Sequence, residues 1–456
     1  MLADTLTPVN IYLKLRDVFA CSLLLESSDY HGHENSLSFI CCDPIASFEV
    51  SGQQVTMQFP DGRNEKQLLK KKGDAVEYLE NFRASFEVPD PHAKYIHGGL
   101  FGYIAYDAVR YFEDVEIPEQ KTPIPDLLYK LYRYVIVVDH FSNELTLFAI
   151  SHHESPDEKN GLDKVEQIIF SNRFATYTFA VTDHEVSNVS DEEFIRMVDK
   201  GKEHCFRGDV FQIVLSRRFT SGFKGDEFNV YRALRSINPS PYLFYFDYGN
   251  FKLFGSSPEA QLQVQKGKAH IFPIAGTFRR SGNDQEDAEI ASRLAADEKE
   301  NAEHVMLVDL ARNDMSRNAE DVTVEVFKEI QYYSHVIHLV SKVTGKIRKD
   351  APVVRIVADT FPAGTLSGAP KHMAMTLINK YENVNRSFYG GAIGYLGFDG
   401  AFNHAIMIRT FLSHDNKLIY QAGAGIVSKS DSESELQEVN NKLSALRQAV
   451  LMAQKI

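Results

Sequence analysis

The chain has 456 residues, 44% of them hydrophobic, and a formal net charge of −13. This length exceeds what one simple core needs, so we expect two domains or one interlocked pair. The longest basic run is three lysines, 70–72. Because phosphate binding requires concentrated positive charge, we expect no nucleic-acid partner.

The sequence also bears on the compartment. No apolar run approaches the ~20 residues that cross a bilayer, so we expect no membrane contact. The first residues lack a basic segment followed by an apolar one, so no signal peptide is predicted. The four cysteines show neither metal-ligand spacing nor a disulfide framework. A reducing, cytoplasmic location is the expectation.

Strands are predicted over most of the first 150 residues, because these are rich in β-branched and aromatic side chains. The predicted strands are 22–26, 38–42, 46–52, 54–59, 132–141 and 144–150. The polar stretch 152–161 predicts a turn, followed by a short helix and a strand at 176–181. Residues 182–194 indicate a linker, and Ser190 with Glu193 forms a capping-box pattern before a helix. We therefore place domain boundaries at 1–185 and 186–456.

The second part mixes both kinds of element. Strands are predicted at 209–219, 242–248 and 252–257, and helices at 285–312 and 431–453. Helices and strands do not alternate regularly, which disfavours a doubly wound parallel sheet. The expected fold class is α+β with large, mostly antiparallel sheets.

Two glycine-rich stretches resemble each other across the chain, GGLFGYIAYD (98–107) and GGAIGYLGFD (390–399). Glycines inside strands let another backbone or a ligand approach closely. The pattern predicts two tightly packed strands, and it suggests two related sheets, one from each half.

Two helical segments carry pairs of glutamates three residues apart, Glu300 with Glu303 and Glu435 with Glu438. Such pairs share a helix face and repel each other. Capping boxes with Asp297 and with Ser432 would explain Glu300 and Glu435, but not the other two. Each pair is either a solvated face or a set of ligands for Mg²⁺, which prefers carboxylate and water oxygens.

Glycine-rich loops at 364–371 and 423–428 match neither the GxGxxG nor the GxxxxGK[ST] nucleotide motif. They are either ordinary tight turns or backbone N–H groups that face a carboxylate ligand.

Several longer motifs resemble the chorismate-using enzymes, and within them the large-subunit family of anthranilate synthases. The motifs are PIAGT (273–277), DEKENAEHVMLVDLARND (297–314), HLVSKVTG (338–345), FPAGTLSGAPK (361–371), YGGAIGYLGFDG (389–400), IRT (408–410) and QAGAGIVSKSDSESELQEVNNK (421–442). The resemblance covers essentially the whole chain. It implies an α+β fold in which two large sheets pack around a central active site, with helices outside.

The resemblance assigns the acidic pairs to a Mg²⁺ site. Glu303 and Glu438 would bind the ion, which sits on the ring carboxylate of chorismate. Glu300 and Glu435 would act through its waters. The ion would neutralise and orient the substrate.

The resemblance also implies roles around the substrate. Glu259 matches a general acid for loss of the C4 hydroxyl, and His338 matches a histidine beside that hydroxyl. Arg409 and Tyr389 match positions that hold the enolpyruvyl carboxylate. The remaining expected contacts border the ring: Thr365, Ala275, Gly276, Thr277, Gly423, Ala424, Gly425 and Lys442.

Two positions bear on the nucleophile. Related synthases carry a lysine where this chain has Ala275, or a lysine that activates water where it has Gln212. Neither residue can serve, so an external amine remains: ammonia attacks C2, and pyruvate elimination gives anthranilate. A synthase that releases an aminated intermediate, and a tryptophan-binding regulator without catalysis, stay open as alternatives.

The N-terminal half matches a tryptophan feedback pocket of this family. The matching residues are Leu25, Glu26, Ser27, Asn238, Pro239, Ser240, Pro241 and Tyr242, followed by Leu243 where the family often has methionine. No glutaminase motif with a catalytic cysteine is present. The resemblance therefore implies a separate glutamine amidotransferase subunit that supplies ammonia.

Overall fold

The computed structural model describes residues 1–27, 36–87, 98–118, 122–151, 156–332 and 336–456. Of the turn predicted over 152–161, residues 152–155 lie outside these ranges. The prediction is wrong for 156–161, which belong to the helix α3 (Pro156–Phe170). The helices are α1 (Pro8–Leu15), α2 (Asp74–Ala84), the 3-10 helix η1 (Tyr106–Tyr111), α3 (Pro156–Phe170), α4 (Asp191–Arg207), α5 (Phe228–Ile237), α6 (Asp284–Ala296), α7 (Glu298–Ser316), α8 (Val353–Thr360), α9 (Gly364–Ser367), α10 (Lys371–Tyr381) and α11 (Ser432–Ala453).

The strands are β1 (Leu23–Glu26), β2 (Leu37–Ser51), β3 (Gln54–Gln58), β4 (Asn64–Leu68), β5 (Gly99–Ile104), β6 (Leu127–Asp139), β7 (Glu144–Ala149), β8 (Phe179–Val181), β9 (Val186–Ser187), β10 (Gln212–Gly225), β11 (Tyr242–Asp247), β12 (Phe251–Ser257), β13 (Ala260–Gln265), β14 (Lys268–Ile271), β15 (Ile274–Arg279), β16 (Ala319–Tyr332), β17 (Val336–Ile347), β18 (Gly368–Ala369), β19 (Ala392–Gly397), β20 (Phe402–Ile406), β21 (Thr410–His414) and β22 (Lys417–Ile426).

The long antiparallel pair β2–β6 is shared by two sheets. The first half of β2 pairs with β1, which leads through β11, β12, β21 and β22 to β10. The second half of β2 pairs with β3, while β6 pairs with β5, which leads through β19, β20, β13 and β14 to β17. Each sheet therefore contains strands from both halves of the chain, so the expectation of one sheet per half is wrong.

Alternation along these strands separates the buried layers. In β1, Leu23 and Leu25 join the core shared by the two sheets, while Leu24 belongs to the core beneath the helices. Phe244 and Tyr245 of β11 divide in the same way. This is the two-residue period of a strand buried on both faces.

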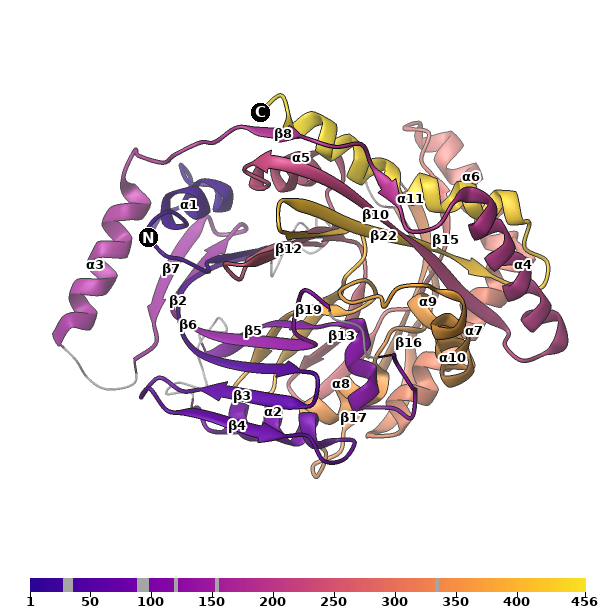
Figure 1. Ribbon diagram of the computed structural model, residues 1–456, viewed down its shortest axis with the longest axis horizontal. Coiled ribbons are helices and arrows are strands. Elements are labelled where there is room, and N and C mark those ends of the chain that lie inside the picture. Colours follow the sequence, from indigo (N-terminus) through magenta and orange to yellow (C-terminus); the bar gives the residue numbers. More distant parts are fainter. Residues whose placement is uncertain (28–35, 88–97, 119–121, 152–155, 333–335) are drawn as a thin grey trace.

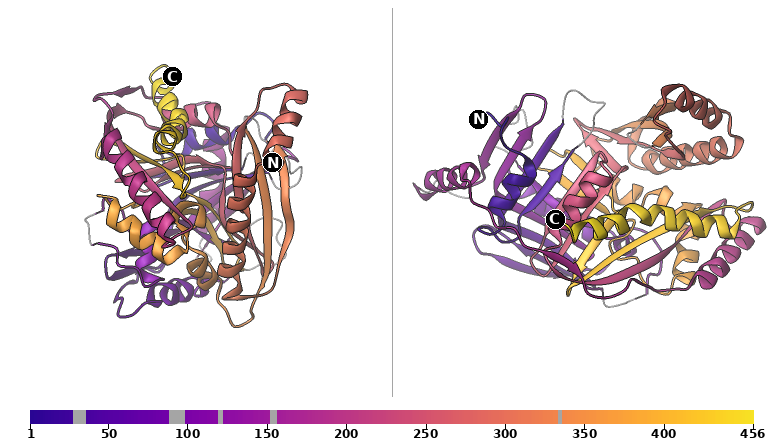
Figure 2. Two further views of the ribbon diagram at one scale, coloured as in Figure 1. Left: turned by 90° about the vertical axis from the view of Figure 1, so that its right-hand side faces the viewer. Right: turned by 90° about the horizontal axis from the view of Figure 1, so that it is seen from above.

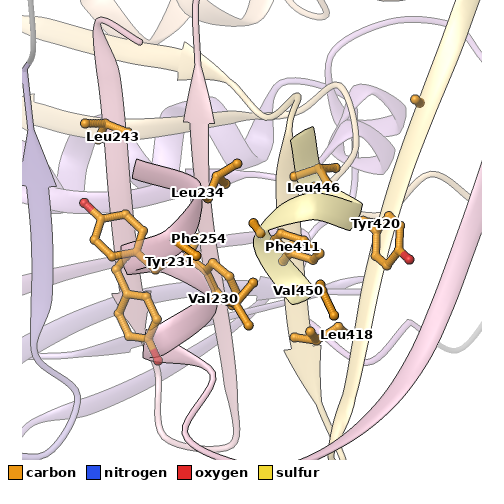
Figure 3. Close-up of a cluster of buried hydrophobic side chains, with 14 of the residues drawn as sticks. Val230, Tyr231, Leu234, Leu243, Phe254, Phe411, Leu418, Tyr420, Leu446 and Val450 are labelled. Carbon is orange, nitrogen blue, oxygen red and sulfur yellow. The ribbon is translucent and has the colours of Figure 1, made fainter. Parts of the chain in front are cut away.

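Helices cover the outer faces of the sheets (Figure 1). α11 packs on α5, α4 and β22, and the view from above shows it lying across that sheet (Figure 2). Val230 and Leu234 of α5 meet Leu446 and Val450 of α11 over Phe411 (Figure 3). α2 and α8 contact each other at the second sheet.

The two glycine-rich stretches form neighbouring strands, which confirms their predicted close packing. β5 and β19 pair antiparallel, with Gly102 directly opposite Gly394. A Cβ added at Gly102 would lie 2.0 Å from the Leu128 carbonyl oxygen, and one at Gly394 would lie 2.0 Å from that of Asn403. The glycines are therefore required by neighbouring backbones.

Helix ends test the local predictions. The capping box at α4 is confirmed: the Ser190 N–H donates to Glu193, and the Glu193 N–H donates to the Ser190 hydroxyl. The single helix predicted over 285–312 is wrong, because extended backbone at Asp297 separates α6 from α7 and its side chain caps α7. The α11 cap is Asp431 rather than Ser432.

Among the described helices, none is long and apolar enough to cross a membrane. The domain boundary near 185 stays a prediction.

Candidate active site

Glu259 and Thr365 form a direct pair where β12 ends and α9 begins. The Thr365 hydroxyl donates to Glu259 Oε1 over 3.0 Å. Burial raises the pKa of Glu259 to about 7, against the opposing effects of the Thr365 hydrogen bond, Lys442 and Arg409. A carboxyl group with this pKa can hold a proton at neutral pH, as a general acid must.

His338 of β17 is oriented by the neighbouring strand β15. Its Nδ1 lies 2.8 Å from the Gly276 carbonyl oxygen. A carbonyl only accepts, so Nδ1 carries the proton and Nε2 is the acceptor. Burial lowers the pKa of His338, and nearby Arg409 lowers it further. The imidazole is therefore neutral at pH 7.

Gly276 sits in a bulge of β15 opposite β17, with φ +66°. A Cβ at this position would lie 3.2 Å from Glu300 Oε2, so the Glu300 carboxylate lies over the glycine. Ala275 is buried beside it. Thr277 pairs with His338 in the β15–β17 ladder, and its side chain lies outside the described residues. The PIAGT stretch thus brings together Glu300 and His338.

Gln212 links α7 to the paired strands β10 and β22. Its amide Nε2 donates to Glu303 Oε1 over 2.8 Å and lies 2.7 Å from a Cβ built at Gly425. Its Oε1 is buried and has no hydrogen-bond partner among the residues that the structure describes. Gly425 therefore leaves the space that lets Gln212 reach the glutamate.

Lys442 on α11 and Tyr389, in the segment before β19, both contact the backbone of Gly423. Lys442 Nζ donates to the Gly423 carbonyl oxygen over 2.9 Å and lies 2.7 Å from Glu438 Oε1. The Tyr389 hydroxyl is hydrogen-bonded by the Gly423 backbone, and burial raises its pKa. Ala424, the next residue, is fully buried. The glycine-rich end of β22 thus gathers a cation, a carboxylate and a phenol.

Arg409 connects this site to the segment before β11. It adopts φ +50° and donates to Asn238 Oδ1 over 3.4 Å. Burial lowers its pKa, and the charge of Glu259 opposes that shift. The guanidinium therefore lies within electrostatic reach of the general-acid candidate.

The four glutamates suit Mg²⁺ by their chemistry. Glu303 and Glu438 accept from Gln212 and Lys442, so a cation would replace these donors. In the described ranges no three His, Cys, Asp or Glu side chains lie close enough to hold one ion. Mg²⁺ does not need such a cluster, because it takes one or two carboxylates and fills its octahedron with waters and substrate oxygens. Glu435 is buried on α11.

The two segments expected to bind an effector are adjacent. Glu26 of β1 pairs with Leu243 of β11, and Leu25 with Phe244. Asn238 donates to the Ser240 hydroxyl, and the Tyr242 hydroxyl accepts from Gln263. Pro239 and Pro241 complete the connection from α5 to β11. Ser27 extends β1 through its N–H to the Leu37 carbonyl oxygen.

The sequence analysis missed the partners of Glu26. Arg235 binds its carboxylate through Nε and Nη2, and the Tyr231 hydroxyl lies 2.5 Å from Oε1. The one local signal was the i, i+4 spacing of Tyr231 and Arg235 on a helix face. Nothing in the sequence connects that face to a residue more than 200 positions earlier.

The chain is similar in sequence to known proteins. The family model described as "chorismate binding enzyme" matches residues 22–448. The chain belongs to this family. It is 38% identical to anthranilate synthase component 1 of Aquifex aeolicus, over 100% of this chain and 94% of the relative. It is 39% identical to that of Acinetobacter calcoaceticus, over 98% and 93%.

Solved structures confirm the expected fold class. Anthranilate synthase component I from Streptococcus pneumoniae matches with a TM-score of 0.81 and 30% identity, covering 98% of this chain and 99% of that one. The menaquinone-specific isochorismate synthase of Escherichia coli matches with a TM-score of 0.74 at 18% identity, over 98% and 92%, and shares the fold.

Proposed function

We propose that this chain is the chorismate-aminating component of an anthranilate synthase. The observation that carries the proposal is the buried Glu259 carboxyl group, protonated near neutral pH, beside Arg409 and Lys442 in a chain of the chorismate-binding family. Relatives named anthranilate synthase component 1, 36–39% identical over nearly the whole chain, support the choice of reaction.

The substrate is held by charge at both ends. Arg409 and Tyr389 bind the enolpyruvyl carboxylate, since a guanidinium meets a carboxylate bidentately. Glu303 and Glu438 would hold Mg²⁺, and Glu300 and Glu435 would support it through bound water. The ion, when bound, neutralises the ring carboxylate. Lys442, Thr365 and the backbone of 423–425 border the ring.

Glu259 and His338 then act on the C4 hydroxyl. Ammonia forms a bond to C2, and the C4–O bond breaks as Glu259 gives its proton to the leaving oxygen, which departs as water. The neutral His338 accepts a hydrogen bond from that hydroxyl through Nε2 and orients it. The new ammonium group loses a proton, which restores the proton given by Glu259. Loss of the C2 proton with cleavage of the C3–O bond then restores aromaticity and gives anthranilate, and the released enol takes up a proton at its methylene carbon to become pyruvate.

Ala275 and Gln212 explain why ammonia, and not the protein or water, attacks. A methyl group offers no nucleophile, and an amide bound to Glu303 is no base. Ammonia then comes from a separate glutamine amidotransferase subunit. Tryptophan bound near Glu26, Ser27 and the 238–243 segment inhibits the reaction. A chain in this role works in the cytoplasm.

Product analysis tests the proposal. We expect the purified chain, mixed with chorismate, Mg²⁺ and an ammonium salt, to form anthranilate and pyruvate in equal amounts by mass spectrometry. An aminated product that retains the enolpyruvyl group would identify a sister synthase. Tryptophan binding without chorismate consumption, also after a glutaminase subunit is added, would indicate a regulator.

A further inference from the structure

We propose that Arg386, which reaches no substrate group, is a positioning residue that holds the general acid Glu259 in its working geometry. This inference rests on the proposed function for its catalytic meaning. Arg386 is 1% exposed and precedes Tyr389 by three residues. Among the described residues it is one of the largest side chains to be fully buried.

Four hydrogen bonds fix its guanidinium. Nε and Nη2 donate to the two carboxylate oxygens of Glu382 over 2.9 and 2.6 Å. Nη1 donates to the Leu366 carbonyl oxygen over 2.5 Å, and Nη2 to that of Val214 over 2.7 Å. The bonds use most of the five N–H groups that arginine has. The guanidinium therefore binds protein groups and has little capacity left to bind a substrate.

These bonds tie together three segments that carry site residues. Leu366 follows Thr365 in α9, and Val214 lies two residues beyond Gln212 in β10. The Tyr389 N–H donates to the Arg386 carbonyl oxygen, and the Tyr389 ring lies 5.6 Å from the guanidinium. One side chain thus sets the relative positions of Thr365, Gln212 and Tyr389.

Glu382 and Tyr106 hold Arg386 itself. Glu382 also accepts from the Ser216 N–H and hydroxyl on β10. Tyr106 lies on η1 in the N-terminal half, and its ring centroid is 4.8 Å from the Arg386 guanidinium. A buried ion pair of this kind rarely adds net stability over an apolar replacement. Its value here is the fixed geometry that a planar fork provides.

The consequence reaches Glu259 through α9. The Thr365 hydrogen bond favours the charged carboxylate of Glu259 and so lowers its pKa. Releasing the Leu366 carbonyl lets α9 shift and weakens that bond. Loss of Arg386 should therefore raise the Glu259 pKa, as direct loss of the Thr365 hydroxyl does.

The test compares Arg386→Lys with a matched control, Arg217→Lys. Lysine keeps the charge beside Glu382 but cannot meet a carboxylate and two carbonyls at once. Arg217, on β10, is likewise a buried arginine that binds a carboxylate, Asp191, and a carbonyl, Val189, but its bonds reach neither α9 nor the segment of Tyr389. The readout is the Glu259 carboxyl pKa, followed by ¹³C NMR of labelled glutamate and assigned with Glu259→Gln.

We expect Arg386→Lys to raise the Glu259 pKa as Thr365→Val does, with no further rise when the two are combined. Its kcat should fall about 10- to 100-fold, with the alkaline limb of the pH profile moved upward. Arg217→Lys should change neither. An unshifted pKa in Arg386→Lys, or a shift that adds fully to that of Thr365→Val, would overturn the inference.

The double variant Arg386→Gln/Glu382→Gln serves if Arg386→Lys does not fold, since it removes both buried charges together. The same pKa rise is expected, and its absence overturns the inference. The NMR readout needs no turnover. A wild-type chain inactive on chorismate would refute the proposed function, while the pKa comparison would still decide the role of Arg386.

Discussion

In the proposed mechanism the buried side chain of Glu259 sets the pH range of the reaction. Its pKa of about 7 exceeds the 4.5 of an ordinary glutamate, mainly because burial disfavours the charge. As an acid it acts only when protonated. At a fixed concentration of unprotonated ammonia, turnover should therefore be full below pH 7 and fall as the pH rises through that value.

Glu259→Gln should abolish turnover and change the stability profile. The folded wild type binds more protons than the unfolded chain between about pH 4.5 and 7, so its stability declines as the pH rises through that range. Glutamine cannot titrate, so the stability of the variant lacks the decline that Glu259 causes. Urea unfolding should show the variant gaining stability relative to wild type from pH 5 to pH 8. Parallel profiles would contradict the buried, raised pKa.

At the scale of single residues, the sequence motifs supplied candidate site residues but not the contacts that these residues make. The roles proposed for Glu259 and His338 come from the family resemblance, and the structure brings Thr365 to the first and Gly276 to the second. Arg386 and Arg235 were missed because the partners that connect them to the site are distant in sequence, Leu366 and Val214 for the first and Glu26 for the second. A single sequence contains no signal for such contacts, which form only when the sheets pack.

At the scale of secondary-structure elements, the proposed Mg²⁺ site depends on two helices. α7 and α11 each present a glutamate pair, and local pattern alone placed both on helices. The cap predicted at Asp297 is confirmed, since its side chain accepts from the Glu300 N–H, but one helix was predicted through it over 285–312, because the acidic run contains no proline or glycine. The break at Asp297 lets α7 start afresh under its own cap, with Glu300 in the first turn.

Glu303→Ala should lose turnover at every Mg²⁺ concentration while the fold stays intact, because the change removes a ligand and relieves repulsion with Glu300. Asp309→Asn is the matched control: it also removes an acid from α7, at a side chain 63% exposed. Initial rates over a Mg²⁺ titration distinguish the two. Normal rates in Glu303→Ala would refute the metal assignment.

The close packing of the glycine-rich strands β5 and β19 can be tested by its effect on stability. Gly102→Ala should cost about 3 kcal/mol, since its Cβ would meet backbone atoms that cannot move aside. Gly201→Ala in α4 is the control: its Cβ would meet only side-chain atoms at 3.2 Å, and alanine favours a helix by about 1 kcal/mol. Urea unfolding of both variants measures the difference. Equal stabilities would show that β5 can move away from β6.

At the scale of the molecule, β2 and β6 join the two halves. The fold class was predictable because segments rich in β-branched and aromatic residues do not alternate regularly with helices, but the sharing of β2 between two sheets was not. It depends on a bulge between Pro44 and Ala46 and on Asp43 at φ +60°, which bend the strand. The segment proposed to bind tryptophan contacts the candidate active site through the hydrogen bond that Arg409 donates to Asn238.

Ser27→Ala should weaken tryptophan inhibition, with little effect on the uninhibited rate. The backbone of Ser27 is anchored by Leu37 and Ser36, so removing the hydroxyl leaves β1 in place. The loss of one hydrogen bond to a ligand corresponds to roughly a 10-fold rise in the inhibition constant. An unchanged constant would place the effector elsewhere.

The central claim is that this chain aminates chorismate with ammonia. It is tested most directly by anthranilate fluorescence on mixing the chain with chorismate, an ammonium salt and Mg²⁺, with and without EDTA. We predict a fluorescence rise that needs both ammonium and Mg²⁺ and that Glu259→Gln abolishes. Chorismate consumed without fluorescence, or no consumption even with a glutaminase subunit present, would contradict it.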